Sequence, residues 1–271
     1  MDNRPIGVFD SGLGGLTAVR ELMDLLPNES IVYLGDTGRV PYGTRSKETI
    51  LKYARQDINF LNTFDLKAIL IACGTITTNG LDMIQKEYPL PILGVAEPAA
   101  RAAAAATRNG RIGLIATQAS IRSGLYERII RAESPQTEIF SVPCPLFVSL
   151  VEAGHYAKGD PMVKLAAEEY LTSLQEQKID TLILGCTHYP LLSDAIEDFF
   201  GPAVTLINSG AQGALTFREM LAQKDLLADP QQVSATYQYY VTDRTEQFSR
   251  LAAVFLGRPV SGLVEQVVID Q

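Results

Sequence analysis

The sequence predicts an α/β protein built as two pseudosymmetric lobes, each an open, mainly parallel sheet flanked by helices, with a cleft between them. Three observations predict this fold. Short β-branched runs alternate with longer helical stretches along the whole chain. The first four strand-like runs are echoed by the next four at a nearly constant spacing. The third run of each set ends in a cysteine, Cys73 in one set and Cys186 in the other.

The alternation predicts eight strands with helices between them. Apolar runs that alternate with helices are typical of parallel sheets covered on both faces. The expected strands are 6–9, 31–34, 68–72, 92–95, 112–115, 138–142, 181–184 and 204–207. The expected helices include 16–26, 46–60, 99–107, 162–177 and 191–199. Beyond Gly210, a helix-like segment and a strand-like run at 237–241 are expected to return to the first lobe.

The two sets of four strands indicate an internal duplication. The matching positions in the first and second halves are Ile6 and Ile112, Ile31 and Ile139, Ala68 and Thr181, and Val95 and Ile207. The ordinary alternation of any α/β protein is the alternative explanation. A duplication predicts a first lobe of residues 1–97 plus 208–271 and a second lobe of residues 98–207.

The composition excludes several classes of function. The 271 residues suffice for two domains of ~100–200 residues each. The net charge of −8, without a Lys or Arg cluster, argues against a nucleic-acid partner. The N-terminus has no signal-peptide pattern, and no apolar run approaches the ~18 residues that span a membrane. The three cysteines cannot all pair and form no CxxC motif, so we expect free thiols in the cytoplasm.

The two cysteines at matching strand ends carry the expected chemistry. Open parallel sheets bind ligands beyond the carboxyl ends of their strands, so facing lobes would bring Cys73 and Cys186 to opposite sides of one cleft. The first strand of each half ends in a hydroxyl, Ser11 or Thr117. A thiol has a reference pKa of ~8.5, so modest tuning keeps one thiolate and one thiol at neutral pH. Matched bases on opposite faces are what inversion of a carbon centre requires.

A glycine-rich loop at residues 10–15 is expected to line the same cleft. It follows a strand and precedes a helix, where backbone N–H groups turn toward an anion. The loop is neither a P-loop nor a dinucleotide fingerprint, and a plain tight turn is the alternative. Asp10 favours a ligand site, because a carboxylate at a strand end can orient or charge-balance an active group.

A second loop, at residues 36–43, follows the second expected strand. Pro41, Tyr42 and Gly43 form a rigid turn that offers backbone N–H groups and a phenol to a ligand. Judged from its local sequence alone, the segment fits a structural turn better than a ligand-binding site.

Other side chains also have a structural interpretation beside the functional one. Cys144, between two prolines, is expected to be a buried small hydrophobe, and Glu152 fits an exposed carboxylate near a helix end. His188 could polarise the Cys186 thiol or contact the substrate. A metal site of Cys73, Cys186 and His188 lacks paired-ligand spacing, so we expect no metal. No lysine follows a strand in a glycine-rich loop, so we expect no pyridoxal phosphate and no other cofactor.

Together these motifs resemble the bacterial glutamate racemases of the aspartate/glutamate racemase superfamily. The segments that carry the resemblance are Asp10-Ser11-Gly12-Leu13-Gly14-Gly15, the 36–43 stretch, Cys73 with Thr75, Leu150-Val151-Glu152-Ala153-Gly154, and Gly185-Cys186-Thr187-His188-Tyr189-Pro190. The resemblance implies cofactor-independent racemisation of L- and D-glutamate, which supplies D-glutamate for peptidoglycan, by an enzyme that is commonly a homodimer.

The resemblance also implies roles for individual residues. It implies Cys73 and Cys186 as the two acid/base groups, with Asp10, Glu152 and His188 assisting. The residues that it implies for substrate binding are Asp10, Ser11, Pro41, Tyr42, Gly43, Gly74, Thr75, Thr117, Thr187 and His188.

One position departs from the family pattern. The family usually has Cys-Asn-Thr at the first cysteine, and here the segment reads Cys73-Gly74-Thr75. The missing amide would help hold the substrate, and one lost hydrogen bond in a buried polar site costs about 1–3 kcal/mol, or roughly ten- to hundredfold in rate. Gly74 therefore keeps open a racemase of another amino acid such as aspartate. A non-catalytic two-lobed amino-acid-binding protein is a further alternative.

Overall fold

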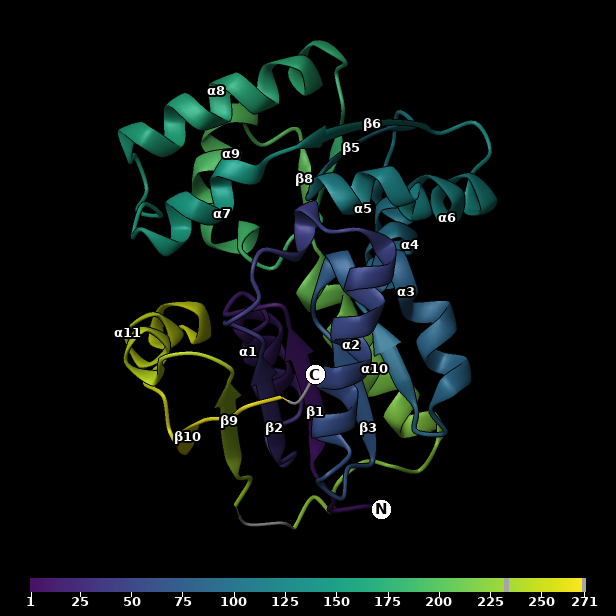
Figure 1. Cartoon of the computed structure of the whole chain (residues 1–271). Helices are drawn as coiled ribbons and strands as arrows, with labels where there is room; N and C mark the ends of the chain where they lie inside the picture. Colours follow the sequence, from purple (N-terminus) through teal and green to yellow (C-terminus); the bar gives the residue numbers. More distant parts are fainter. Residues whose placement is uncertain (232–233, 270–271) are drawn as a thin grey trace.

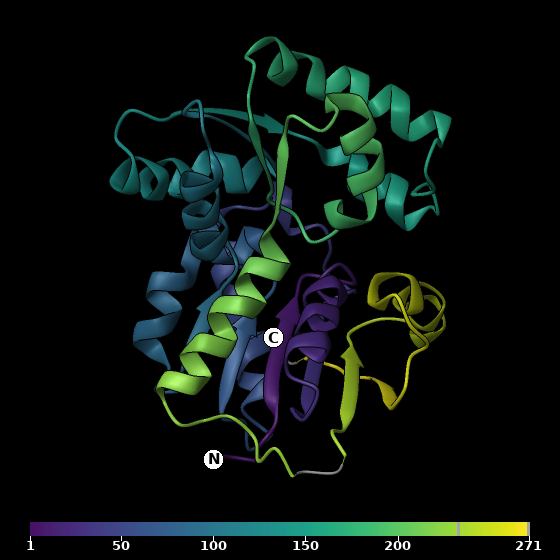
Figure 2. The same cartoon turned by 180° about the vertical axis from the view of Figure 1, so that it is seen from behind.

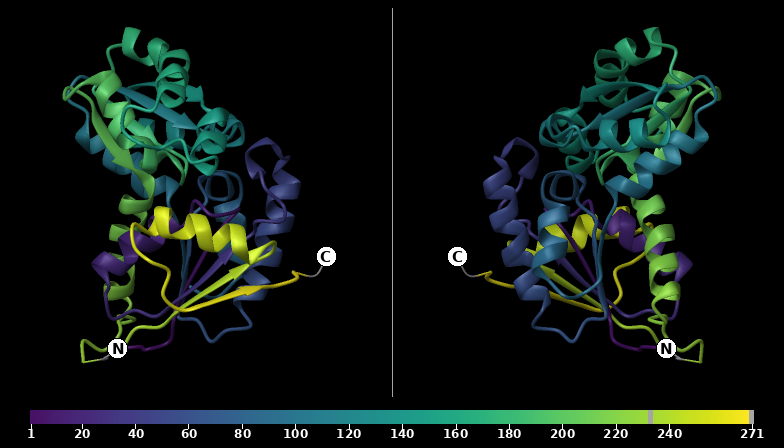
Figure 3. Two further views of the ribbon diagram at one scale, coloured as in Figure 1. Left: turned by 90° about the vertical axis from the view of Figure 1, so that its left-hand side faces the viewer. Right: turned by 90° about the vertical axis from the view of Figure 1, so that its right-hand side faces the viewer.

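Two separate parallel β-sheets form the framework of the protein. The computed structural model describes residues 1–231 and 234–269. The first sheet occupies the lower half of Figure 1, with the N-terminus, and the second sheet lies above it. Helices flank both sheets, as the reverse view in Figure 2 and the side views in Figure 3 show. The predicted α/β fold with two open parallel sheets is confirmed.

The first sheet has six strands in the order β10-β9-β2-β1-β3-β4. Their bounds are β1 (Ile6–Asp10), β2 (Ile31–Gly35), β3 (Ala68–Ile71), β4 (Ile92–Gly94), β9 (Tyr237–Val241) and β10 (Leu263–Gln266). The central strands β1 and β3 are buried along their whole length, as expected where helices cover both faces. The end of the chain returns to this sheet, because β9 pairs with β2.

The second sheet has four strands in the order β6-β5-β7-β8. Their bounds are β5 (Arg111–Ala116), β6 (Glu138–Pro143), β7 (Thr181–Leu184) and β8 (Thr205–Asn208). This order repeats the β2-β1-β3-β4 order of the first sheet. The register repeats as well: Ile6 pairs with Ile31 and Ala68, as Ile112 pairs with Ile139 and Thr181. The first three matches of the predicted duplication are thereby confirmed.

The predicted match of Val95 with Ile207 is wrong by two residues. Ile71 of β3 pairs with Gly94, and its counterpart Leu184 of β7 pairs with Asn208. Gly94 and Asn208 are therefore the equivalent positions. A slip of two residues leaves every side chain on the same face of the sheet, so the apolar pattern alone could not exclude it.

Eleven α-helices are described in residues 1–231 and 234–269. Their bounds are α1 (Leu16–Leu25), α2 (Lys47–Leu61), α3 (Gly74–Glu87), α4 (Ala96–Ala106), α5 (Gln118–Ser123), α6 (Leu125–Glu133), α7 (Pro145–Glu152), α8 (Pro161–Glu176), α9 (Ser193–Phe200), α10 (Ser209–Gln223) and α11 (Thr245–Leu256). Two short 3₁₀ turns are η1 (Tyr42–Thr44) and η2 (Tyr189–Leu192). None of the helices in the described part of the chain is both long and apolar enough to cross a membrane.

Side chains just before the first turn set where several helices begin. Thr117, Asp160 and Asn208 each accept backbone N–H bonds of the turn that follows, which satisfies donors that a helix start leaves free. At Asn208 the chain passes from β8 straight into α10, which runs down beside the first sheet in Figure 2. There α10 packs against α1 and α4. The exact lobe boundaries at 97/98 and 207/208 remain predictions.

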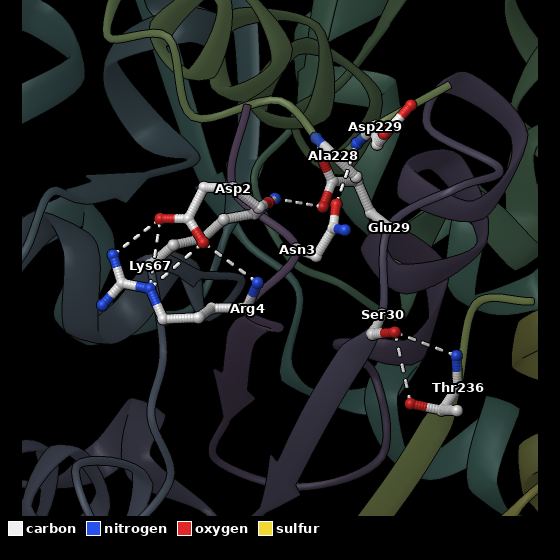
Figure 4. Close-up of polar contacts among 9 residues, drawn as sticks. All are labelled: Asp2, Asn3, Arg4, Glu29, Ser30, Lys67, Ala228, Asp229 and Thr236. Carbon is white, nitrogen blue, oxygen red and sulfur yellow. Dashed lines mark hydrogen bonds and ion pairs between the residues drawn. The ribbon is translucent and has the colours of Figure 1, made fainter. Parts of the chain in front are cut away.

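A buried ion pair joins four segments of the chain at the end of the first sheet near the N-terminus (Figure 4). Lys67 Nζ lies 2.5 Å from Glu29 Oε2 and donates to the carbonyl of Asp2 at 2.6 Å. The backbone N–H of Ala228 donates to Glu29 Oε1 at 2.8 Å. Both charged side chains are almost completely buried. The pair therefore ties together the N-terminal segment, the entries to β2 and β3, and the segment that returns to the first sheet.

We expect Glu29→Gln to lower the free energy of unfolding by about 3–5 kcal/mol, because it leaves the buried Lys67 ammonium without its counter-charge. Urea unfolding measures the change. The matched control is Glu87→Gln, which breaks the exposed Arg55–Glu87 pair and is expected to cost about 0–1 kcal/mol. Equal costs for the two variants would contradict this account of the buried pair.

Candidate active site

A cavity of about 320 Å³ lies where the loops after the strands of both sheets meet. Every residue that the sequence predicted for the site lines it: Asp10, Ser11, Pro41, Tyr42, Gly43, Cys73, Gly74, Thr75, Thr117, Glu152, Cys186, Thr187 and His188. Residues up to 75 come from the first sheet and its loops, and those from 117 onward come from the second. Both sheets therefore contribute to one cavity, as the facing-lobe prediction requires.

Sequence reasoning missed part of the wall. The additional lining residues are Thr44, Gln118, Pro145, Val148, Ser149 and Gly185, together with Gly12 and Val40 of the loops at 10–15 and 36–43 that the sequence already singled out. Most of them adjoin residues that were predicted. Val148 and Ser149 stand four and three positions before Glu152 on α7, so helical spacing puts them on the same face. That spacing was the signal that could have found them.

The Cys73 thiol stands between the end of β3 and the start of α3. The residue caps the N-terminus of α3, and its Sγ donates to Ser11 Oγ at 3.6 Å. Its side chain is buried. Burial and the charge of Asp10 raise the pKa of the Cys73 thiol well above its ordinary value. Cys73 is therefore a neutral thiol in the unliganded protein.

The Cys186 thiol lies beside a histidine–carboxylate pair. Its Sγ is 3.9 Å from His188 Nδ1, and His188 Nε2 is 2.9 Å from Glu152 Oε1. Burial lowers the pKa of His188, but the hydrogen bonds with Cys186 and Glu152 outweigh burial and raise that pKa to about 10. Protonated His188 therefore places a cation beside the Cys186 thiol. The two thiols therefore have different surroundings, one neutral and buried, the other half-buried beside a cation.

Asp10 is a buried carboxylate at the end of β1. Its Oδ2 accepts the backbone N–H of Gly15 at 2.8 Å and the hydroxyl of Thr187 at 3.5 Å. Burial raises the pKa of Asp10, while His188 and the N–H of Gly15 act in the opposite direction. Its Oδ1 has no hydrogen-bond partner among the described residues. Because Asp10 lines the cavity, it offers an acceptor to a ligand that carries N–H donors.

Hydroxyl groups connect the two halves of the site. Thr75 Oγ1 and Thr117 Oγ1 lie 2.9 Å apart, and Thr17 Oγ1 donates to the carbonyl of Thr187 at 3.0 Å. Each bond joins a helix that flanks the first sheet to a loop that follows a strand of the second sheet. The cavity walls are thus held in register by direct contacts between the halves.

The loop at residues 36–44 rests on a buried charged network. Asp36 and Asp57 have fully buried side chains, and Arg39 donates to both, at 2.6 and 2.9 Å. The Tyr42 hydroxyl donates to Asp36. The phenol is therefore engaged in this network, and the predicted contact of the Tyr42 side chain with a ligand stays a prediction. Burial and the charge of Asp36 raise the pKa of Asp57 well above its usual range.

Of the residues that had both a functional and a structural interpretation, Glu152 lies in the site and Cys144 has a structural role. Glu152 ends α7 and is partly exposed, but its carboxylate binds His188. Cys144 is fully buried, and its Sγ donates to the carbonyl of Val142 at 3.6 Å, so the predicted hydrophobic role is confirmed. Across residues 1–231 and 234–269, no cluster of three or more His, Cys, Asp or Glu side chains is arranged for a metal ion.

Comparison with known proteins identifies the family. The model of the Asp/Glu/hydantoin racemase family matches residues 17–214. A glutamate racemase from Syntrophus aciditrophicus is 45% identical over 263 residues, which are 97% of this chain and 96% of that relative. The chain belongs to the glutamate racemase family. The resemblance predicted from its motifs is confirmed, and membership in this family makes the chain an isomerase.

Solved glutamate racemases share the fold over nearly the whole chain. An isoform from Bacillus anthracis superposes with a TM-score of 0.93 at 36% identity, covering 98% of each chain. The glutamate racemase from Francisella tularensis, solved in complex with D-glutamate, superposes with a TM-score of 0.90 at 39% identity. That match covers 100% of this chain and 99% of the other. The two-sheet architecture is therefore the architecture of this family.

We expect the His188 imidazole to titrate at about pH 10 in the folded protein, against 6.5 for an ordinary histidine. The protonated form is therefore stabilised by folding. Its contribution to stability is complete below pH 6.5 and is lost as the pH rises through about 10. Glu152→Gln removes one cause of the raised pKa and should lower it.

Histidine titration by NMR checks this expectation, because the chain has only two histidines. His155→Gln assigns the two resonances, and wild type and Glu152→Gln are compared between pH 6 and pH 11. A His188 pKa that stays the same in Glu152→Gln would show that the carboxylate does not hold the proton.

We expect Arg39→Met to lower the free energy of unfolding by about 3–5 kcal/mol, because it leaves two buried carboxylates without a cation. Urea unfolding at pH 7 measures the loss. The variant should recover part of its stability toward acidic pH, where Asp57 gains a proton more readily. A loss below about 1 kcal/mol, as for an exposed ion pair, would contradict the network's role.

Proposed function

We propose that this chain interconverts L- and D-glutamate without a cofactor, using Cys73 and Cys186 as the two acid/base groups. The observation that supports the proposal is that equivalent strands of the two sheets each end in a thiol, and both thiols line one cavity. Inversion at a carbon needs a proton removed from one face and delivered to the other. Two thiols from two halves of a duplicated fold suit that requirement.

In the proposed reaction one thiolate removes the α-proton while the other thiol donates a proton to the opposite face. In one direction Cys186, which lies beside protonated His188, is the base, and buried Cys73 is the proton donor. A turnover that starts from this state leaves Cys73 as the thiolate and Cys186 as the thiol. The product state is therefore ready for the reverse reaction, and each direction uses a different cysteine as the base.

The substrate carboxylates are held by neutral groups in this proposal. No Lys or Arg side chain is among the residues that line the cavity. Backbone N–H groups at the start of α3 and the hydroxyls of Ser11, Thr75, Thr117 and Thr187 are the available donors. The unpaired Oδ1 of Asp10 suits the α-ammonium group, because it is an anionic acceptor.

We also propose that the chain works in the cytoplasm as a homodimer and supplies D-glutamate for peptidoglycan. Membership in the glutamate racemase family and the three free cysteines support this. Light scattering of the purified protein tests the dimer; a monomeric mass at micromolar concentration would sink that part.

A second candidate substrate is aspartate or another amino acid. Gly74 favours it, because the family's asparagine side chain is absent at this position of the cavity wall. Circular dichroism of a panel of chiral amino acids, each incubated with the protein, compares the substrates directly.

We expect the purified protein to racemise glutamate and to place deuterium at the α-carbon of the product in heavy water, without pyridoxal phosphate. Cys73→Ser and Cys186→Ser should each lower racemisation at least about a thousandfold, since each removes one of two required acid/base groups. Cys144→Ser is the matched control and should retain activity, because this thiol lies outside the cavity.

Two results would contradict the proposal. Absence of both racemisation and α-deuteration in the wild type would remove glutamate as the substrate. Full activity in either Cys73→Ser or Cys186→Ser would remove the two-thiol mechanism. Glutamate binding with no exchange of the α-hydrogen would instead indicate a binding protein.

A further inference from the structure

The backbone turn that carries the second thiol lacks one of its own hydrogen-bond donors. The carbonyl of Cys186 accepts the N–H of Tyr189, three residues later, at 3.1 Å. The same spacing leads from Thr187 to Pro190, and proline has no N–H. The carbonyl of Thr187 therefore needs a donor from outside the turn.

Thr17, in α1 of the first half, supplies that donor. Its Oγ1 lies 3.0 Å from the carbonyl oxygen of Thr187 and 2.9 Å from that of Gly14. A hydroxyl has one proton to donate, and the Gly14 carbonyl already accepts the backbone N–H of Thr17 at 3.0 Å. The Thr187 carbonyl is therefore the acceptor that depends on the hydroxyl. Thr17 is only 1% exposed, so water has little access to replace it.

Other groups of the first half surround the same turn. Asp10 Oδ2 accepts the hydroxyl of Thr187 at 3.5 Å. A Cβ on Gly14 would lie 2.1 Å from Thr187 Oγ1 and 2.6 Å from His188 Nδ1, so the glycine loop packs directly on both residues. The ring of Phe255 in α11 packs perpendicular to the His188 ring, with centroids 5.2 Å apart. The turn after β7 is thus seated in the first half, although β7 belongs to the second sheet.

We infer that Thr17 is a positioning residue for the second thiol. By holding the Thr187 carbonyl, its hydroxyl fixes the backbone that carries Cys186 and His188, and so sets where Cys186 Sγ meets the substrate. Cys73 follows a strand of the first sheet and does not depend on this bond. The inference rests on the proposed two-thiol reaction and goes beyond it, because Thr17 is not among the residues that line the cavity.

A reaction that needs one thiol can show which thiol is displaced, whereas racemisation uses both. Elimination from 3-chloroglutamate requires one thiolate. That thiolate removes the α-proton, the electron pair forms the Cα–Cβ double bond, and chloride leaves. The enamine then tautomerises to an imine, which water hydrolyses to 2-oxoglutarate and ammonium. Each C2 epimer presents its α-proton to a different thiol, so the two epimers report on the two thiols separately.

The test measures elimination from both epimers in the wild type, Thr17→Val and Thr17→Ser. Cys186→Ser should lose elimination from one epimer only, which identifies the epimer that Cys186 deprotonates. We expect Thr17→Val to lower the kcat for that epimer at least about tenfold, because a misplacement of about 1 Å can cost about a hundredfold. The kcat for the other epimer should stay within about threefold. Thr17→Ser keeps the hydroxyl and should restore the wild-type ratio of the two rates.

The matched control is Thr137→Val, at another buried threonine. The Thr137 hydroxyl donates to Ser134 Oγ at 2.9 Å, just before β6 and at the end of the second sheet away from the cavity. The ratio of the two elimination rates should not change in this variant. If thermal unfolding shows that Thr17→Val does not fold, Thr17→Ala is measured in the same way, since alanine also lacks the hydroxyl and is favourable in a helix.

Each outcome bears on the inference. An unchanged ratio in Thr17→Val would overturn it. An equal fall for both epimers would also overturn it, because damage to the whole site lowers both rates. A Thr17→Ser variant that keeps the altered ratio would remove the hydroxyl as the cause. If Cys73→Ser and Cys186→Ser show no preference between the epimers, the proposed two-thiol reaction fails first, and the inference fails with it.

Discussion

Parallel hydrogen bonding within each sheet is the constraint on which the rest of the structure depends. Because all strands of a parallel sheet point the same way, the loops that follow them gather at one side of the sheet, beyond the carboxyl ends of the strands. The protein has two such groups of loops, one for each sheet, and both contribute to a single cavity. Cys73 and Cys186 directly follow equivalent strands, so each sheet places one thiol at the cavity without an additional loop. The helices between the strands bury both faces of each sheet. Polar side chains of the two sheets can therefore meet only beyond the carboxyl ends of the strands.

The repeat makes the backbones equivalent but leaves the chemical surroundings of the thiols different. Cys73 is buried next to Asp10, and both burial and charge disfavour its ionisation. Cys186 is less buried and faces His188, which Glu152 helps to keep protonated. A duplicated fold therefore supplies matched positions, and a few side chains that were not duplicated give the two thiols different surroundings.

Local sequence patterns predicted most of the fold and most of the residues that line the cavity. They failed where a side chain contacts a residue far away in the sequence. The buried runs of β1 and β3 are unmistakable, whereas β10 is exposed and half polar, so no apolar run marks it. Tyr42 was correctly predicted to line the site, but its phenol turns to Asp36 and Asp57, which no local pattern reveals. The buried pair of Glu29 and Lys67 was also invisible, because only the fold brings the two residues together.

The return of the chain end to the first sheet has a consequence for synthesis. Gly35 at the end of β2 pairs with Val241 of β9, so β2 keeps an unpaired edge until the last part of the chain is made. At about 5–20 residues per second, that interval lasts about 10 to 40 s. The strands of the second sheet, by contrast, lie between residues 111 and 208 and are complete earlier. An unpaired strand edge can pair with another chain, so the nascent protein is open to misassembly at β2 until β9 covers it.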